Sequence, residues 1–321
     1  MNKINWQTPL ALFNVAQTRE LEALAAARIS SGPSLMEKAG LAIAKLALAT
    51  KPFASCYWIF CGPGNNGGDG LEAATHLHQW GRAVRVVLWQ PEAPRPPDAK
   101  QALLKVTALG IAIDSQMPAN IGAQDLCVDA MLGIGLRSVS TSSASNASSA
   151  TEARMQDWID SIYQSGADVL AVDVPSGLNA NTGQYQNKSA SAHRHATHTL
   201  QLLTAKPGCF TAHGRDACGT LWLDTLGTED LQLTHQASAQ LNVQLNFQLS
   251  TASKALHASH KGTYGDVAVI GGEGVEQRGM GMTGAVDLAA SAALHAGAGR
   301  IMACYLSSDS AASYTPRLAE I

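Results

Sequence analysis

The sequence lacks three features that would each indicate a particular class of protein. None of its six cysteines forms a C-x-x-C pair, so neither a zinc knuckle nor a dithiol redox site is predicted. The formal net charge of -3 offers no basic field that could gather nucleic acid. The N-terminal residues never build an uninterrupted apolar run. We therefore expect neither a signal peptide nor a membrane span, and we predict a cytoplasmic protein.

Short apolar runs alternate along the chain with segments that are long enough for helices. Two helices are expected ahead of the first strand, at 14–29 and 33–49, where apolar residues recur at helical spacing. The runs predicted as strands are 57–62, 84–89, 125–132, 167–174 and 197–204. This alternation is typical of a parallel sheet with helices on both faces.

Two shifts in composition divide the chain. Residues 138–151 are almost entirely Ser, Ala, Thr and Asn, and we interpret them as a mobile surface insertion because they can bury little apolar surface. Residues 233–255 are rich in Gln and Ser and are expected to connect two domains. After them, a strand at 266–272 and a helix at 283–296 begin a separate α/β unit.

A glycine-rich loop, GPGNNGGDGL at 62–71, lies between a predicted strand and a predicted helix. Gly62, Gly64 and Gly67 satisfy the G-x-G-x-x-G pattern of dinucleotide-binding oxidoreductases. Asp69 argues against that function, because it places a carboxylate where a pyrophosphate would bind. A tight turn without any ligand is a second alternative.

The order of four motifs gives a more specific indication. PSLMEKAG (33–40), GNNGGDGL (64–71), VDAMLGIGL (128–136) and VDVPSGL (172–178) together resemble the N-terminal domain of the NAD(P)H-hydrate epimerases. HKGTYGDVAVIGG (260–272) and GMTGAVDLAASAALHAGAGRI (281–301) resemble the start of the ADP- or ATP-dependent NAD(P)H-hydrate dehydratases. The chain therefore resembles the bifunctional NAD(P)H-hydrate repair enzymes.

The resemblance implies a Rossmann-like three-layer αβα sandwich with a parallel sheet at 10–232. A linker at 233–255 and the N-terminal part of a ribokinase-like α/β domain at 256–321 would follow. The implied activity is epimerisation of the R and S forms of NAD(P)HX, the hydrates of NADH and NADPH. A longer parent protein would also dehydrate the S form at the expense of ADP or ATP. The resemblance leaves room for a homo-oligomer, because related epimerase domains often pair.

The resemblance also implies a set of site residues at the carboxyl ends of the strands, where open α/β sheets bind ligands. Asp173 and Lys206 are the candidate catalytic residues. A potassium ion would be held by Asn66, Asp129 and Ser176, because hard cations prefer oxygen ligands. The implied substrate-binding residues are Asn65, Asn66, Gly67, Gly68, Asp69, Gly133, Ile134, Gly135, Leu136, Arg137, Ser138, Val139, Asp173 and Ala285.

Residue type alone leaves structural alternatives open at these positions. Asn66 and Ser176 are also residues that satisfy turn amides, Asp173 could be a helix-capping or turn carboxylate, and Lys206 could be an exposed cation. Ile134 stands where the family commonly has Thr, so a side-chain hydroxyl is missing there. A non-catalytic binding module remains an alternative function.

Overall fold

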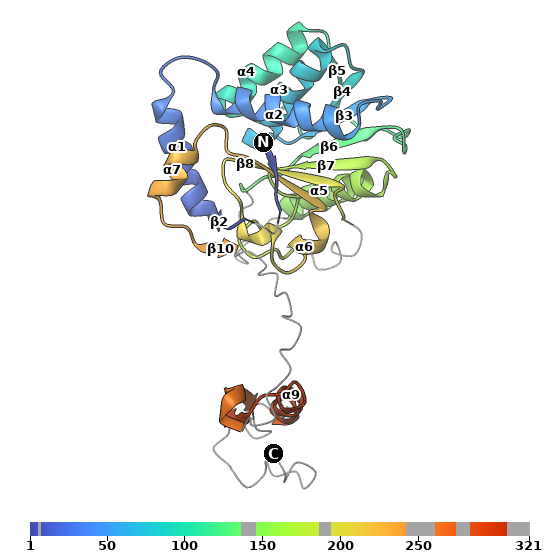
Figure 1. The fold of residues 1–321 in the computed structure, drawn as a ribbon. Helices are drawn as coiled ribbons and strands as arrows, with labels where there is room; N and C mark the ends of the chain where they lie inside the picture. The colour runs from blue at the N-terminus through green and yellow to red at the C-terminus, as the bar shows by residue number, and fades with distance from the viewer. Residues whose placement is uncertain (6–7, 136–145, 186–193, 242–260, 274–282, 307–321) are drawn as a thin grey trace. The chain divides into compact units, whose positions relative to one another are not determined.

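The computed structural model describes residues 1–5, 8–135, 146–185, 194–241, 261–273 and 283–306. The chain divides into two compact units, Met1–Gln244 (unit 1) and Leu245–Ile321 (unit 2). Figure 1 shows the elements of each unit.

Unit 1 is built on an eight-stranded sheet with the order β1-β9-β8-β7-β6-β3-β4-β5. Neighbouring strands are parallel except β1 and β9, which are antiparallel. A separate antiparallel pair joins β2 to β10. The strands are β1 (Asn2–Lys3), β2 (Leu10–Leu12), β3 (Tyr57–Cys61), β4 (Val84–Leu88), β5 (Ala112–Asp114), β6 (Leu126–Ala130), β7 (Asp168–Val172), β8 (His198–Leu202), β9 (Thr220–Asp224) and β10 (Ala239–Leu241).

Helices cover both faces of this sheet: α2, α3 and α4 lie on one face, and α5 and α6 lie on the other (Figure 1). Helices α1 and α7 lie together at one end of the sheet. The helices of unit 1 are α1 (Val15–Arg28), α2 (Leu35–Thr50), α3 (Asn65–Gln79), α4 (Pro97–Ala108), α5 (Asn146–Gln164), the 3-10 turn η2 (Pro207–Cys209), α6 (Gly214–Ala217) and α7 (Glu229–Thr234).

The central strands are buried on both faces, and successive side chains enter different hydrophobic clusters. Ile59 packs in the cluster that includes residues of α2, α3 and α4, whereas Trp58 and Phe60 pack in the cluster that includes Ile162 of α5. Strands buried on both faces give the near-continuous apolar runs seen in the sequence. The expected parallel sheet with helices on both faces is therefore confirmed.

Both N-terminal helices begin at capping boxes. Asn14 caps α1 and Ser34 caps α2, and each side chain accepts a hydrogen bond from the backbone N–H three residues later. Gln17 and Glu37 return the bond to the N–H of the capping residue. Reciprocal bonds of this kind satisfy N–H groups that have no partner inside the helix.

Several expectations need correction. Two strands, β1 and β2, precede the first helix, so the prediction that two helices come first is wrong. The segment 233–255 contributes β10 to unit 1, where β10 pairs with β2. Residues 146–151 of the predicted surface insertion belong to α5, and residues 138–145 lie outside the described residues.

Unit 2 contains η3 (Lys261–Tyr264), β11 (Asp266–Glu273), α9 (Thr283–His295) and β12 (Arg300–Leu306). β11 and β12 are parallel neighbours, with α9 between them in the chain. Val286 and Ala290 of α9 are buried, but Ile270 and Leu288 are 72% and 75% exposed. These elements therefore leave much of their apolar surface uncovered within the described residues.

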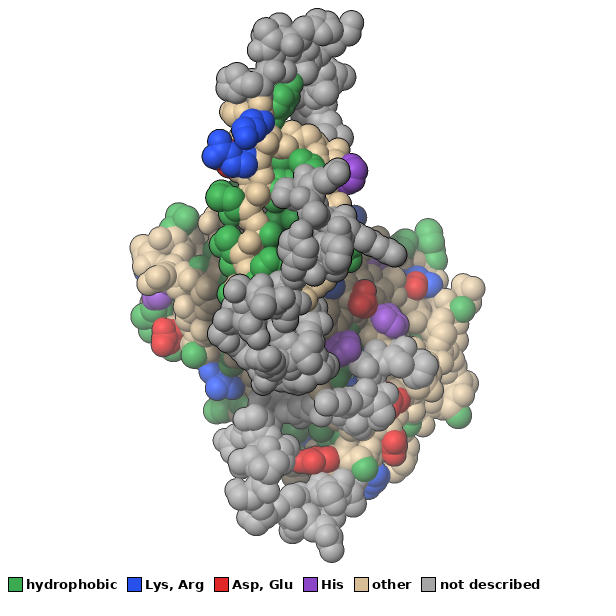
Figure 2. Space-filling view, turned by 90° about the horizontal axis from the view of Figure 1, so that it is seen from below, with side chains coloured by type: hydrophobic (Ala, Val, Ile, Leu, Met, Phe, Trp, Pro, Cys, Tyr) green, Lys and Arg blue, Asp and Glu red, His purple; other side chains and the backbone are tan. Residues whose placement is uncertain are grey.

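The surface shows no concentration of one charge on the face drawn in Figure 2, where the described acidic and basic side chains are scattered. Among the described helices, none combines the length and the apolar character needed to cross a membrane.

Candidate active site

A cavity of about 750 Å³ opens in unit 1 at the carboxyl ends of β3, β6, β7 and β8. The order of the sheet reverses here, because β3 pairs with β4 on one side and with β6 on the other. Parallel sheets bind ligands at such a reversal, since the loops on either side leave in opposite directions. A cavity of this size accommodates a ligand of several hundred daltons.

The glycine-rich loop forms one side of the cavity as the first turn of α3. Gly64 is the N-terminal residue that flanks the helix, and no side chain caps the helix there. The first backbone N–H groups of α3 are therefore available to an anion. Asn65, Asn66 and Asp69 line the cavity.

Gly67 and Gly68 do not line the cavity, and their lack of a side chain serves packing. A Cβ atom on Gly67 would lie 1.9 Å from the carbonyl oxygen of Gly62. A Cβ atom on Gly68 would lie 2.6 Å from the end of the Met36 side chain. These glycines allow α3 to pack closely against strand β3 and helix α2, and the substrate contact implied by the resemblance stays a prediction for both.

The end of β7 and the segment after β8 bring Asp173 and Lys206 into direct contact. Lys206 Nζ donates a hydrogen bond to Asp173 Oδ1 and another, of 2.6 Å, to the carbonyl oxygen of Leu202. Asp173 Oδ1 also accepts from the Leu202 N–H at 3.2 Å. Lys206 is 1% exposed and Asp173 is 7% exposed, so this ion pair is almost completely removed from water.

The remaining atoms of the pair are free to meet a ligand. No described residue donates a hydrogen bond to Asp173 Oδ2, and Lys206 Nζ retains one N–H beyond the two it donates. Asp173 has a φ of 68°, a left-handed conformation that non-glycine residues rarely adopt. The backbone therefore holds this carboxylate at the cavity by local strain, which is frequent at functional sites.

Two further carboxyl groups, Glu22 and Asp69, line the same cavity. Burial, followed by the charges of Asp173, Glu22 and Glu72, raises the pKa of Asp69 well above its ordinary value. Burial and then the charge of Asp173 raise the pKa of Glu22. The cavity thus combines a carboxylate paired with a lysine and two carboxyl groups whose pKa values are raised.

The residues expected to hold a potassium ion surround the loop that follows β6. Asp129, which is fully buried, accepts hydrogen bonds from Ser176 Oγ at 2.6 Å, from Ser176 N at 2.9 Å and from Tyr163 Oη at 2.7 Å. Leu132 N donates to Ser176 Oγ at 2.9 Å. A Cβ atom on Gly133 would lie 3.0 Å from Asn66 Oδ1, so the Asn66 amide lies against the same loop.

This donor set fits a hard monovalent cation. It consists of the Asp129 carboxylate, the Ser176 hydroxyl, the Leu132 carbonyl group beside that hydroxyl and the Asn66 amide, all of which supply oxygen. The Asn66 Nδ2 atom is buried and has no hydrogen-bond partner, and rotating the amide by a half turn would place its oxygen at that position. Within the described ranges, no group of three His, Cys, Asp or Glu side chains gathers as a metal site.

The second loop implied by the resemblance is described only in part. Gly133, Ile134 and Gly135 line the cavity, whereas Leu136, Arg137, Ser138 and Val139 lie outside the described residues. Ala285 belongs to α9 of unit 2 and is exposed.

Helix α1 supplies a side of the cavity that the sequence motifs do not indicate. Thr18, Arg19, Glu22 and Ala26 line it, and the buried Thr18 hydroxyl lies 2.8 Å from the hydroxyl of Thr204, after β8. Three of the four recur at intervals of four residues, which places them on one face of the helix. That interval predicts a shared face but not what the face meets.

Comparison with known proteins is consistent with the motifs. The family described as YjeF-related protein N-terminus matches residues 32–208. The chain is 36% identical over 214 residues to the NAD(P)H-hydrate epimerase of Bordetella pertussis, a match that covers 66% of this chain and 86% of that protein. The crystal structure of yeast ynu0 has the same fold, with a TM-score of 0.52 and 20% identity over 67% of this chain and 88% of that one.

Longer relatives match most of the chain. The bifunctional NAD(P)H-hydrate repair enzyme Nnr of Coxiella burnetii is 33% identical over 290 residues, which are 90% of this chain and 55% of that protein. The chain thus spans about half the length of the bifunctional relatives it matches. It belongs to the YjeF-related N-terminal family, the family of the NAD(P)H-hydrate epimerases and of the bifunctional NAD(P)H-hydrate repair enzymes.

Proposed function

We propose that this chain interconverts the R and S forms of NAD(P)HX in the cavity at the carboxyl ends of β3, β6, β7 and β8. The buried Asp173–Lys206 pair carries the proposal, because it presents one unbonded carboxylate oxygen to the cavity. The similarity to the Bordetella pertussis epimerase over most of that protein's length supports the same reaction.

The chemistry requires transfer of protons at one carbon. In the hydrate, this carbon bears both a hydroxyl group and the ring nitrogen, and inverting it requires either ring opening or reversible loss of the hydroxyl. Both routes need a base and an acid in fixed positions. Asp173 accepts the hydroxyl proton through Oδ2, and Lys206 holds the carboxyl group in place through Oδ1.

The rest of the cofactor needs contacts that hold phosphate and ribose. The uncapped first turn of α3, with Asn65 and Asn66, suits the phosphate groups, because free N–H groups at a helix N-terminus bind anions. The loop of Gly133, Ile134 and Gly135 lies beside it in the cavity and presents backbone groups without bulky side chains at its glycines. Leu136, Arg137, Ser138 and Val139, which follow Gly135 in the sequence, are also among the proposed binding residues.

Asn66, Asp129 and Ser176 would hold a potassium ion near the loop after β6. When bound, the ion would supply positive charge beside the phosphate-binding loops. Replacing potassium by sodium in the assay is expected to lower the rate, because the smaller ion fits a different number of oxygen ligands.

We further propose that unit 2 is the start of a ribokinase-like dehydratase domain that spans residues 256–321 in this chain. The parallel β11 and β12 with α9 between them support this assignment. In the longer parent protein, this domain would dehydrate S-NAD(P)HX with ADP or ATP, and Ala285 would contact the hydrate.

The test measures the conversion of purified R-NADPHX to the S form by chromatography, with wild-type chain and with Asp173→Asn. The substitution keeps the shape of the side chain but removes the base, so we expect kcat to fall by about 10²- to 10⁴-fold. Circular dichroism establishes that the variant is folded. Wild-type activity in a folded Asp173→Asn variant would contradict the proposed site.

A further inference from the structure

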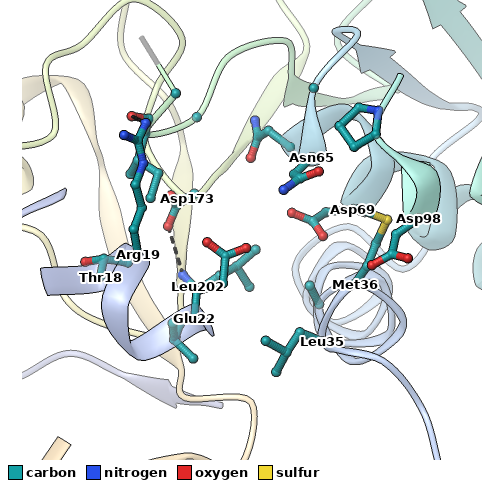
Figure 3. A pocket seen from close by; sticks show the side chains of 18 of the residues that line it. Thr18, Arg19, Glu22, Leu35, Met36, Asn65, Asp69, Asp98, Asp173 and Leu202 are labelled. Atoms are coloured by element: carbon teal, nitrogen blue, oxygen red, sulfur yellow. Dashed lines mark hydrogen bonds between the residues drawn. The ribbon is translucent and has the colours of Figure 1, made fainter. Parts of the chain in front are cut away.

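The face of α1 turned to the cavity carries a carboxyl group that neither the motifs nor the comparisons single out. Glu22 extends from this helix into the space that Asp69 approaches from α3 and Asp173 approaches from the end of β7 (Figure 3). The three carboxyl groups therefore come from three separate elements and face one volume. Titratable side chains that face a cavity of ligand size are candidates for general acid and general base.

Glu22 differs from Asp173 in its partners. Asp173 accepts hydrogen bonds from Lys206 and from the Leu202 backbone, whereas no described residue donates a hydrogen bond to the Glu22 carboxyl group. Glu22 is half-buried, and its side chain lines the cavity. The Glu22 carboxyl group is thus available to a molecule in the cavity.

Opposing effects act on the pKa of Glu22. Burial and then the charge of Asp173 raise this pKa, whereas Lys206 after β8 and Arg19 on the same helix lower it, and the balance is a raised pKa. Asp69 on α3 and Asp98 on α4 also face the cavity. Glu22 therefore lies among the basic groups of Arg19 and Lys206 and the acidic groups of Asp173, Asp69 and Asp98.

We propose that Glu22 is a catalytic acid of the epimerisation, donating a proton to the ring nitrogen of the hydrate while Asp173 accepts one from its hydroxyl group. This inference rests on the proposed function. The carbon–nitrogen bond breaks with its electrons moving to nitrogen, and the electrons of the hydroxyl O–H bond form a carbonyl group. Rotation about the bond to the carbonyl carbon presents its other face. Ring closure then returns both protons, and no oxidant or reductant is consumed.

The experiment compares wild-type chain with Glu22→Gln and with a matched control, Glu20→Gln. Glu20 is exposed on the same helix and does not line the cavity. Glu22→Gln is expected to lower kcat for R-to-S conversion by at least about 100-fold, a typical loss for a general acid, with KM changed by less than about threefold. Glu20→Gln is expected to retain the wild-type kcat.

The pH profile distinguishes an acid from a structural support. Wild-type kcat should fall on the alkaline side as Glu22 loses its proton, and Glu22→Gln should lack this decline in its residual activity. The proposal is overturned if Glu22→Gln retains both wild-type kcat and the alkaline decline, or if Asp69→Asn removes that decline while Glu22→Gln does not. A folded wild-type chain without any epimerase activity overturns the proposed function together with this inference, whereas an active wild type with an active Glu22→Gln overturns this inference alone.

Discussion

The two sides of the cavity are built in different ways. The sheet wall consists of the segments after β3, β6, β7 and β8, including Asp173 and Lys206, and its charged pair is buried and hydrogen-bonded. The helix wall consists of Thr18, Arg19, Glu22 and Ala26 of α1, and its Arg19 is exposed. Hydrogen bonds at the strand ends therefore hold Asp173 and Lys206 in place, whereas a helix outside the sheet supplies the other side of the site.

The helix wall is secured by contacts between distant parts of the sequence. Asn14 Nδ2 donates to Ser238 Oγ at 2.8 Å, and Gln17 Nε2 donates to the carbonyl oxygen of Gln236 at 2.8 Å. These contacts place the start of α1 against the segment that leads into β10. The sheet wall, in contrast, depends on the core of the sheet itself.

The two walls are expected to differ most in how much the free energy of unfolding falls when a basic residue is replaced. Lys206→Met leaves the Asp173 carboxylate buried without its partner, so the free energy of unfolding should fall by about 3–5 kcal/mol. Arg19→Met on the helix wall should change it by less than about 0.5 kcal/mol, because Arg19 is exposed. Urea unfolding followed by tryptophan fluorescence reports on unit 1, since all six tryptophans precede residue 245. If both substitutions lowered the free energy of unfolding by the same amount, the two walls would not differ in this way.

A smaller loss of stability is expected when a side chain is added at Gly67, where α3 packs closely against the end of β3. In Gly67→Ala, the new Cβ atom would lie 1.9 Å from Gly62 O, and relieving this overlap should cost about 1–3 kcal/mol. Gly135→Ala is the control, because a Cβ atom there meets nothing within 4 Å. Thermal unfolding of both variants measures the difference. If Gly67→Ala were as stable as Gly135→Ala, the close packing of α3 on β3 would not be required.

The smallest loss of stability is expected at Asn14, which caps α1 and bonds this helix to Ser238. Asn14→Ala removes the cap of α1 and the bond to Ser238, and should reduce the free energy of unfolding by about 1 kcal/mol. Thr107→Ala, at an exposed position of α4, should change it by less than about 0.5 kcal/mol. Urea titrations of the two variants provide the measurement. A cost at Asn14 no larger than at Thr107 would show that α1 is held mainly by its apolar face.

The sequence predicted the central part of the fold because that part depends on local patterns. Apolar runs of strand length identify β3, β4, β6, β7 and β8, and a Ser before an apolar helical pattern predicts the start of α2. The edge strands β1 and β5 were not predicted, because they have only two and three residues. The strand β9, which lies between β1 and β8, was not predicted either. The pairing of β2 with β10 joins segments more than 200 residues apart, and no local pattern indicates it.

The sequence likewise predicted some residues of the site and missed others. Asp173 lies at the end of one predicted strand and Lys206 follows another, and the structure brings them into contact, although residue type alone would have favoured a turn carboxylate and an exposed cation. Gly67 and Gly68 are predicted to bind substrate, and the structure adds that their missing side chains allow close packing of α3. Glu22 was not a candidate, because nothing in a helical pattern shows that a polar position faces the carboxyl edge of a sheet.

The epimerase site is best tested by measuring R-to-S conversion of NADPHX side by side for wild-type chain, Asp173→Asn and Glu22→Gln, all verified as folded. We expect the wild type to accelerate conversion well above the spontaneous rate and a substitution in either wall to lower kcat by about 100-fold or more. A folded wild type that gives only the spontaneous rate would show that this cavity is not an epimerase site.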